Sequence, residues 1–195
     1  MTDLEERLRD ILDPIRSSGV EALLSALAAE IEAGGDVEAE PARQEPGGST
    51  VRSGPLSLPQ RGDLAVTRDG RRLVRRIEES EVASFDPVTF IFDGGFTSVI
   101  GPFQWGAAEL LVEAAQEKPD WGPLRLWYLE WFQARRTDVA PDLAGVLHGL
   151  EGPYEGAEGW RFRLDFGSAP VTAASDLVAA VMHSGARRMR LSYAE

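Results

Sequence analysis

Every aromatic side chain of this sequence lies in its second part. The chain of 195 residues contains five Trp, three Tyr and eight Phe, and the first of these is Phe85. Because aromatic side chains bury the largest areas and dominate hydrophobic cores, we expect the aromatic core within 85–195. This boundary predicts three parts: an N-terminal helical arm at 1–33, a linker at 34–60 and an α+β domain at 61–195.

The chain is acidic and lacks cysteine. Thirty-two acidic residues against twenty basic ones give a net charge of −12. Without cysteine, a disulfide scaffold, a zinc finger, a cysteine nucleophile and an iron–sulfur protein are excluded. A strongly acidic protein repels polyanions, so the composition disfavours nucleic-acid binding. Local arginine clusters nevertheless leave a nucleic-acid-associated role as a second alternative.

Three features predict a cytoplasmic bacterial protein. The first residues, Met-Thr-Asp-Leu-Glu-Glu, are acidic where an export signal is basic and then apolar. The sequence contains no run of about eighteen apolar residues of the kind that spans a membrane. Nineteen of the twenty basic residues are Arg, a bias typical of a GC-rich bacterial genome.

Residues 3–33 have the spacing of an amphipathic helix. Pro14 and Ser17-Ser18-Gly19 predict an interruption, because proline removes a backbone donor. The apolar stripe continues beyond this interruption at Leu23, Leu27 and Ile31. Such a stripe must be covered, either by the chain's own domain or by a partner protein, which could be a second copy of this chain.

A linker and two hairpins are expected after the arm. Residues 34–60 are rich in Gly, Pro and Glu, a composition typical of flexible linkers. Asp69-Gly70 predicts a hairpin within 61–77, and Asp93-Gly94 predicts another within 88–100. The stretch from Arg71 to Val82 would equally fit a helix, with Arg75 and Glu79 at i,i+4 spacing. In the second hairpin, apolar and polar side chains also alternate along both strands.

The remaining segments predict further helices and strands. We expect helices at 105–118, 123–136 and 170–183, and strands at 145–151, 160–166 and 188–193. The alternation of apolar residues after Ala107 would also fit a strand. The chain should therefore form an α+β fold: a mixed, largely antiparallel sheet with two or three helices packed on one face, preceded by the helical arm and the flexible linker.

Two side-chain rows are candidates for partner binding. Trp127 and Trp131 lie on one face of the helix at 123–136, where they form either the core seam or an interface anchor. If 105–118 is helical, Glu109, Glu113 and Glu117 share a face. Such a row is usually solvated, but it can also mimic a polyanion in front of a basic partner.

Arginines on two predicted strands are candidates for anion binding. The outward positions of these strands are Arg161, Arg163, Arg188 and Arg190. If the two strands are neighbours, four guanidinium groups form one patch, either as a solvated sheet face or as a site for an anion. The turn Gly167-Ser168-Ala169-Pro170 precedes a helix and could also hold an anion.

No strong catalytic motif occurs in the sequence. It lacks a phosphate loop, a nucleophile elbow, a dinucleotide fingerprint and paired histidines at metal-ligand spacing. His148 and His183 have no evident acidic or serine partner nearby in sequence. We therefore assign no catalytic residue, metal ligand or cofactor.

These observations favour a non-enzymatic interaction module, such as an adaptor or an inhibitor or immunity-type protein that binds another protein. Self-association through the N-terminal helix would fit the same pattern. The alternative is a small enzyme with a cleft in which His148 meets a carboxylate and an arginine. That alternative predicts a concave pocket where these three kinds of group converge.

Overall fold

The computed structural model describes residues 2–77, 84–114, 119–133 and 142–193. This part of the chain forms an α+β fold with an N-terminal helix and largely antiparallel sheets, as the sequence predicts. Its helices are α1 (Thr2–Glu32), α2 (Gly122–Gln133) and α3 (Val171–His183). Its strands are β1 (Asp36–Ala39), β2 (Arg52–Ser53), β3 (Leu58–Pro59), β4 (Leu64–Arg68), β5 (Arg71–Arg75), β6 (Val88–Ile91), β7 (Thr97–Ile100), β8 (Ala108–Ala114), β9 (Gly149–Gly156), β10 (Gly159–Asp165) and β11 (Ala186–Ser192).

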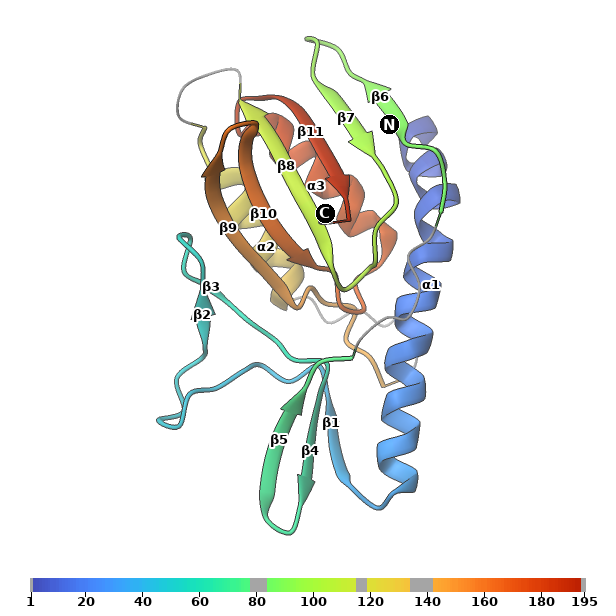
Figure 1. The fold of residues 1–195 in the computed structure, drawn as a ribbon, viewed down its shortest axis with the longest axis vertical. Helices are drawn as coiled ribbons and strands as arrows, with labels where there is room; N and C mark the ends of the chain where they lie inside the picture. The colour runs from blue at the N-terminus through green and yellow to red at the C-terminus, as the bar shows by residue number, and fades with distance from the viewer. Residues whose placement is uncertain (1, 78–83, 115–118, 134–141, 194–195) are drawn as a thin grey trace.

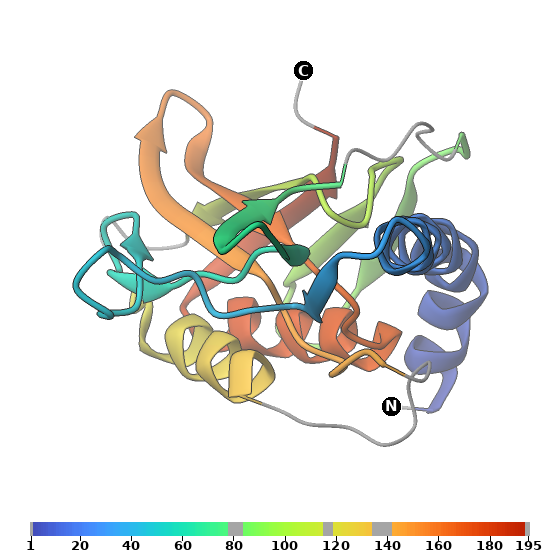
Figure 2. The ribbon, with the colours of Figure 1, turned by 90° about the horizontal axis from the view of Figure 1, so that it is seen from below.

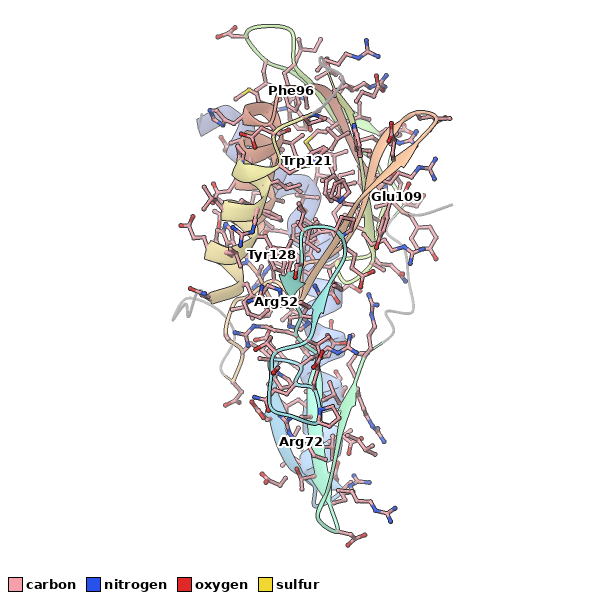
Figure 3. The ribbon with its side chains drawn as sticks, turned by 90° about the vertical axis from the view of Figure 1, so that its left-hand side faces the viewer. Arg52, Arg72, Phe96, Glu109, Trp121 and Tyr128 are labelled. Atoms are coloured by element: carbon pink, nitrogen blue, oxygen red, sulfur yellow. The ribbon has the colours of Figure 1, made fainter. Side chains whose placement is uncertain are left out.

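The main sheet has six strands in the order β6-β7-β11-β8-β10-β9. Its only parallel pair is β7 with β11, and the other neighbours run antiparallel. Figure 2 shows α2 and α3 together on one face of this sheet. Figure 3 places Tyr128 and Trp121 on this helical side and Glu109 on the opposite side.

Alternating side chains divide the sheet into these two faces. On β10, Phe162 and Leu164 are buried in the core, while Arg161 and Arg163 are exposed. This follows from the strand geometry, in which successive side chains point to opposite faces. The apolar face of α2 covers the buried side with Leu124, Trp127, Tyr128, Trp131 and Phe132.

Helix α1 is continuous, so the predicted interruption at Pro14 is wrong. The N-terminal half of its stripe, including Leu8 and Leu12, joins the main core. Leu23 and Leu27 pack in a second cluster with residues of other segments. Local propensity disfavours a proline inside a helix, but the apolar side chains of α1 are buried in both hydrophobic clusters. This tertiary packing stabilises the helix on both sides of Pro14. None of the described helices is both long enough and apolar enough to cross a bilayer.

Residues 34–60 are more ordered than linker composition predicts. Strand β1 pairs with β4 in a three-stranded sheet of order β1-β4-β5, and β2 pairs with β3. Glu40, Leu58 and Gln60 are buried. The segment obtains its order from contacts with its neighbours, since it has no aromatic core of its own. The division into arm, linker and domain stays a prediction.

Both predicted hairpins are present. Asp69 and Gly70 connect β4 to β5 with φ angles of 51° and 72°, as the mirror-image turns of tight hairpins require. In the β6–β7 hairpin the connection is longer than the Asp93-Gly94 pair predicts. It is closed by a hydrogen bond from the N–H of Phe92 to the carbonyl of Phe96.

The helix predicted at 105–118 is wrong. Within this range β8 occupies Ala108–Ala114, and 115–118 lie outside the described residues. The strand pairs with β10 on one side and β11 on the other, and this non-local pairing outweighs the helical propensity of its alanine and glutamate residues. The other predicted helices and strands are confirmed, with shifted ends; positions 134–136 of the predicted second helix lie outside the described residues.

Candidate functional site

A cavity of about 440 Å³ lies between the lower end of the six-stranded sheet and the β4–β5 hairpin. Figure 1 shows this hairpin below the ends of β8, β9 and β10. Segments far apart in the sequence contribute to its wall, which includes Arg43, Gln60, Arg61, Gly62, Asp63, Val74, Arg75, Arg76, Ala107, Ala108, His148, Gly149, Glu151, Arg163, Leu164 and Asp165. Its volume falls in the range typical of small-molecule sites.

His148 lies at the base of this cavity and is almost fully buried. Its Nδ1 is 2.7 Å from Oδ1 of Asp63, and its Nε2 is 2.8 Å from Oε1 of Glu40. Ionised carboxylates only accept hydrogen bonds, so both ring nitrogens donate and the ring is an imidazolium. Burial alone would lower the pKa of His148, but the hydrogen bonds to Asp63 and Glu40, with the charges of Asp165 and Glu40, raise it to about 10.

Glu40, directly after β1, connects this histidine to the turn before α3. Its carboxylate accepts hydrogen bonds from the Ser168 hydroxyl at 2.5 Å, from the Ser168 N–H at 3.2 Å and from the Ala144 N–H at 2.5 Å. Burial would raise the pKa of Glu40, but the hydrogen bond and charge of His148 and the bonds from Ser168 and Ala144 hold it below its usual value.

The anion predicted at the turn 167–170 is therefore the chain's own carboxylate. Glu40 reaches this turn with a φ of 51°, a left-handed conformation that is strained for a glutamate and that surrounding contacts must maintain. Gly167 in the same turn has no room for a side chain, because an added Cβ would lie 2.3 Å from Cδ2 of His148. The local backbone is thus built around the His148 ring.

Asp63 and Asp165 are the two carboxylates between this network and the cavity. Both oxygens of Asp63 have a partner, since Oδ1 bonds to His148 and Oδ2 accepts the N–H of Ile77 at 2.5 Å. Asp165, the last residue of β10, keeps 17% of its side chain exposed. Its Oδ1 accepts the Gly167 N–H at 3.0 Å and lies 4.0 Å from Nδ1 of His148.

The environment of Asp165 brings its titration close to neutral pH. Its Oδ2 is 3.5 Å from a guanidinium nitrogen of Arg76. The pKa of Asp165 is raised from 3.8 to about 6, and burial is the largest cause. The positive charges of His148 and Arg76 oppose this rise, whereas the negative charge of Asp63 adds to it. Asp165 can therefore exchange a proton near neutral pH, whereas His148 stays charged.

Asp63, His148 and Asp165 also form the kind of cluster that can bind a metal ion, since one possible ligand atom from each lies within 4.8 Å of the others. A histidine ligand must offer a neutral nitrogen with a lone pair. Both nitrogens of His148 already lie within hydrogen-bond distance of carboxylate oxygens, at 2.7 and 2.8 Å, so neither is directed at a vacant position. The cluster is accordingly a network of paired charges, and we assign no metal to it.

Four of the eight residues predicted to bind a partner are buried in the core. Trp127 and Trp131 are buried, and their indole N–H groups bond to the carbonyl of Ala173 and to the side chain of Asp176. Leu23 and Leu27 are buried as well. The core interpretation therefore applies to the aromatic helix, and the chain itself covers most of the N-terminal stripe.

Among the partner candidates that the structure describes, Ile31 is exposed, and Glu109 and Glu113 are half-buried. Ile31 keeps 57% of its surface exposed near the end of α1. Glu109 and Glu113 share a face of β8, as alternate strand positions do, and Glu117 lies outside the described residues. Glu113 lies within ion-pair distance of Arg187 and Arg188, so this part of the row is balanced by neighbouring bases.

The two strands that carry the four predicted anion-binding arginines are not neighbours. Strand β8 lies between β10 and β11 and places Glu109 beside Arg163, and Glu113 beside Arg188. Arg161 and Arg190 both approach Glu158. Arg163 alone among the four lines the cavity.

Sequence reasoning identified His148 but missed Glu40, Asp63, Asp165 and Arg43. The partners of His148 lie 108 and 85 residues earlier and 17 residues later in the chain, so no local spacing indicates them. The sequence also suggested an anion at the turn after β10. In the structure this turn donates hydrogen bonds to the protein's own Glu40 carboxylate. His183, by contrast, lies exposed at the end of α3 and bonds to the carbonyl of Ala179.

Comparisons with protein-family models, curated proteins and solved structures found no match for this chain. The site must therefore be interpreted from its own geometry.

Proposed function

We propose that this protein binds a small anionic molecule in the cavity beside His148. The observation that carries the proposal is the charge of the cavity wall. Among the residues that line it, five arginines and the imidazolium oppose three carboxylates, a local charge of +3. This charge is still +1 when Glu40 and Glu30, the partners of His148 and Arg75, are included, in a protein whose net charge is −12. A positive cavity in an acidic protein attracts small anions locally, while the overall field repels large polyanions.

Two of the five arginines are the best candidates for contacting the ligand. Arg61 is held by the carbonyls of Phe132 and Glu40, Arg75 pairs with Glu30, and Arg76 bonds to the carbonyl of Gly106. Arg43 and Arg163, in contrast, have no ion-pair partner among the residues that the structure describes. A guanidinium group can bind a carboxylate or a phosphate through two parallel hydrogen bonds.

The histidine would hold the site in position, with no direct part in proton transfer. The imidazolium donates one N–H to Glu40 and the other to Asp63, so it holds both carboxylates in place. Because its pKa is raised to about 10, it stays positively charged near neutral pH. The alternative of a small enzyme requires a cleft with a histidine, a carboxylate and an arginine, and the cavity contains these groups. In that alternative Asp165 is the residue suited to proton exchange, because its pKa is about 6.

Calorimetric titration with citrate and with inorganic phosphate tests the anion site. We expect saturable binding that Arg43→Gln and Arg163→Gln each weaken about tenfold, since a charge-assisted hydrogen bond contributes about 1.5–3 kcal/mol. Arg188→Gln, on the same sheet face but outside the cavity, is the matched control and should leave the affinity unchanged. If neither citrate nor inorganic phosphate binds at millimolar concentration, the proposal is contradicted.

Binding of a partner protein, as an adaptor or an inhibitor, is a second candidate. The supporting observation is the edge strand β5, whose five residues are all exposed, with Leu73 62% and Val74 42% exposed. An extended segment of a partner can pair with such an exposed edge strand as an additional strand. The arginines of β5 would attract an acidic segment and repel the β5 edge of a second copy of this chain. If this is correct, Arg71→Glu combined with Arg72→Glu abolishes capture of the partner from native cells, whereas Arg188→Glu does not.

A further inference from the structure

We propose that the anion is a phosphate group, either free or as a monoester, and that Asp165 selects it by accepting a hydrogen bond from the proton that the phosphate carries. This inference rests on the proposed anion site and names the ligand class that the site would prefer. It follows from the position of a carboxylate acceptor beside an arginine donor on one wall of the cavity.

The strand geometry places these two groups side by side. Arg163 and Asp165 are two residues apart on β10, so their side chains project from the same face. Both line the cavity. A ligand that contacts the guanidinium of Arg163 is therefore within reach of the carboxylate of Asp165.

Asp165 retains the capacity to accept this bond. A carboxylate offers about four lone-pair positions, and the described contacts of Asp165 are the Gly167 N–H, Arg76 and the more distant His148. Asp63 also has one partner on each oxygen, but its contacts of 2.7 and 2.5 Å are shorter than those of 3.0 and 3.5 Å at Asp165. Its side chain is also less exposed, at 12% against 17%. Asp165 is thus the more available acceptor of the two.

A carboxylate in an anion site discriminates among anions by their protons. Sulfate and carboxylates are fully ionised near neutral pH, so they offer no hydrogen to Asp165 and are repelled by its charge. Phosphate carries a proton, and a phosphate monoester has a second pKa of about 6, close to that of Asp165. One proton can then be shared between the two groups, as in a coupled pair of acids.

The charges that face Asp165 favour such sharing. Asp63 and Glu151 are negative, while His148, Arg76 and Arg163 are positive, and Glu40 lies behind the imidazolium. Above about pH 6, where Asp165 and the monoester are both ionised when free, complex formation should take up a proton.

The test is calorimetric titration of the full chain with inorganic phosphate, glycerol phosphate and sulfate. Each titration is repeated in two buffers that differ in ionisation enthalpy, because the difference in heat measures proton uptake. For the wild type we expect sulfate to bind at least tenfold more weakly than phosphate, with proton uptake on binding of the ester. In Asp165→Asn, whose amide can donate to sulfate, the preference should disappear together with the proton uptake.

Glu155→Gln is the matched control, since it removes an exposed carboxylate of β9 that does not line the cavity and should keep the preference for phosphate. Tighter binding of glycerol phosphate than of inorganic phosphate would support the ester as the ligand. Tighter binding of inorganic phosphate would support the free ion. If the wild type binds sulfate as tightly as phosphate, Asp165 is not selective and this inference is overturned while the anion site remains. If none of the anions binds, the proposed function fails as well. The wild-type comparison decides the matter even if Asp165→Asn does not fold.

Discussion

The Nε2 atom of His148 lies 2.8 Å from Oε1 of Glu40, a residue 108 positions earlier in the chain. Both side chains are 1% exposed. This bond joins the segment after β1 to the start of β9 and to the turn before α3, and it stabilises one wall of the cavity. A buried pair of this kind is strongly destabilising to break, because removal of one charge leaves the other without compensation.

Glu40→Gln should therefore lower the free energy of unfolding by about 3–5 kcal/mol. Urea denaturation of the variant and the wild type measures the difference. Glu38→Gln, two residues earlier on β1, removes an exposed carboxylate paired with Arg72 and should change stability by no more than about 0.5 kcal/mol. Equal effects of the two substitutions would mean that the Glu40–His148 pair is not part of the folded state.

The alkaline pH dependence of stability should come largely from His148. Its pKa is raised from 6.5 in the unfolded chain to about 10 in the folded one, so its contribution is fully present below pH 6.5 and is lost as the pH rises towards 10. We expect the free energy of unfolding to fall by up to about 1.4 kcal/mol per pH unit across this interval. Denaturation at several pH values measures the slope. His148→Gln should flatten it, and a wild type with constant stability up to pH 9 would be inconsistent with the imidazolium.

Asp165→Asn should make the protein more stable at pH 8. The folded pKa of Asp165, about 6, is above its ordinary value of 3.8. Ionisation is therefore easier in the unfolded chain, and stability is lost as the pH rises through this interval. Neutral Asn can still accept the Gly167 N–H, so we expect a gain of about 1 kcal/mol or more at pH 8 and a smaller difference at acid pH. A lower melting temperature of the variant at pH 8 would show that the carboxylate is stabilising there.

Trp131→Ala should destabilise the fold by about 3–5 kcal/mol, because a large buried side chain is removed from the core. Trp131 is 2% exposed, whereas Leu126 on the same helix is 67% exposed. Leu126→Ala is therefore the control and should change stability by about 0.5 kcal/mol or less. Chemical denaturation distinguishes this outcome from the interface interpretation, in which Trp131→Ala would leave stability nearly unchanged.

The sequence predicted those helices, strands and turns that are determined by residues close together in the chain. The alternation of Phe162 and Leu164 with Arg161 and Arg163 indicated β10 and its buried face. Asp69-Gly70 indicated its hairpin because few residue pairs adopt positive φ at both positions. Helices α2 and α3 followed from the spacing of their apolar residues in the same way.

The errors occur where distant segments decide the structure. Strand β8 is flanked on both sides by strands that follow it in the chain, and its composition alone favours helix. Pro14 remains helical because α1 is buried on two clusters. The site itself has the same origin, since Glu40, Asp63 and Asp165 meet His148 only after the sheet and the β4–β5 hairpin have formed.

If the proposed function is correct, the cavity beside His148 binds an anion between Arg43, Arg163 and Asp165. This binding can be followed through the backbone amide shifts of ¹⁵N-labelled protein during titration with inorganic phosphate. We expect saturable shifts concentrated at Gly62, Gly149 and Gly167, with the exposed ends of β6 and α1 unaffected. Shifts that map to another surface, or none at saturating phosphate, would contradict it.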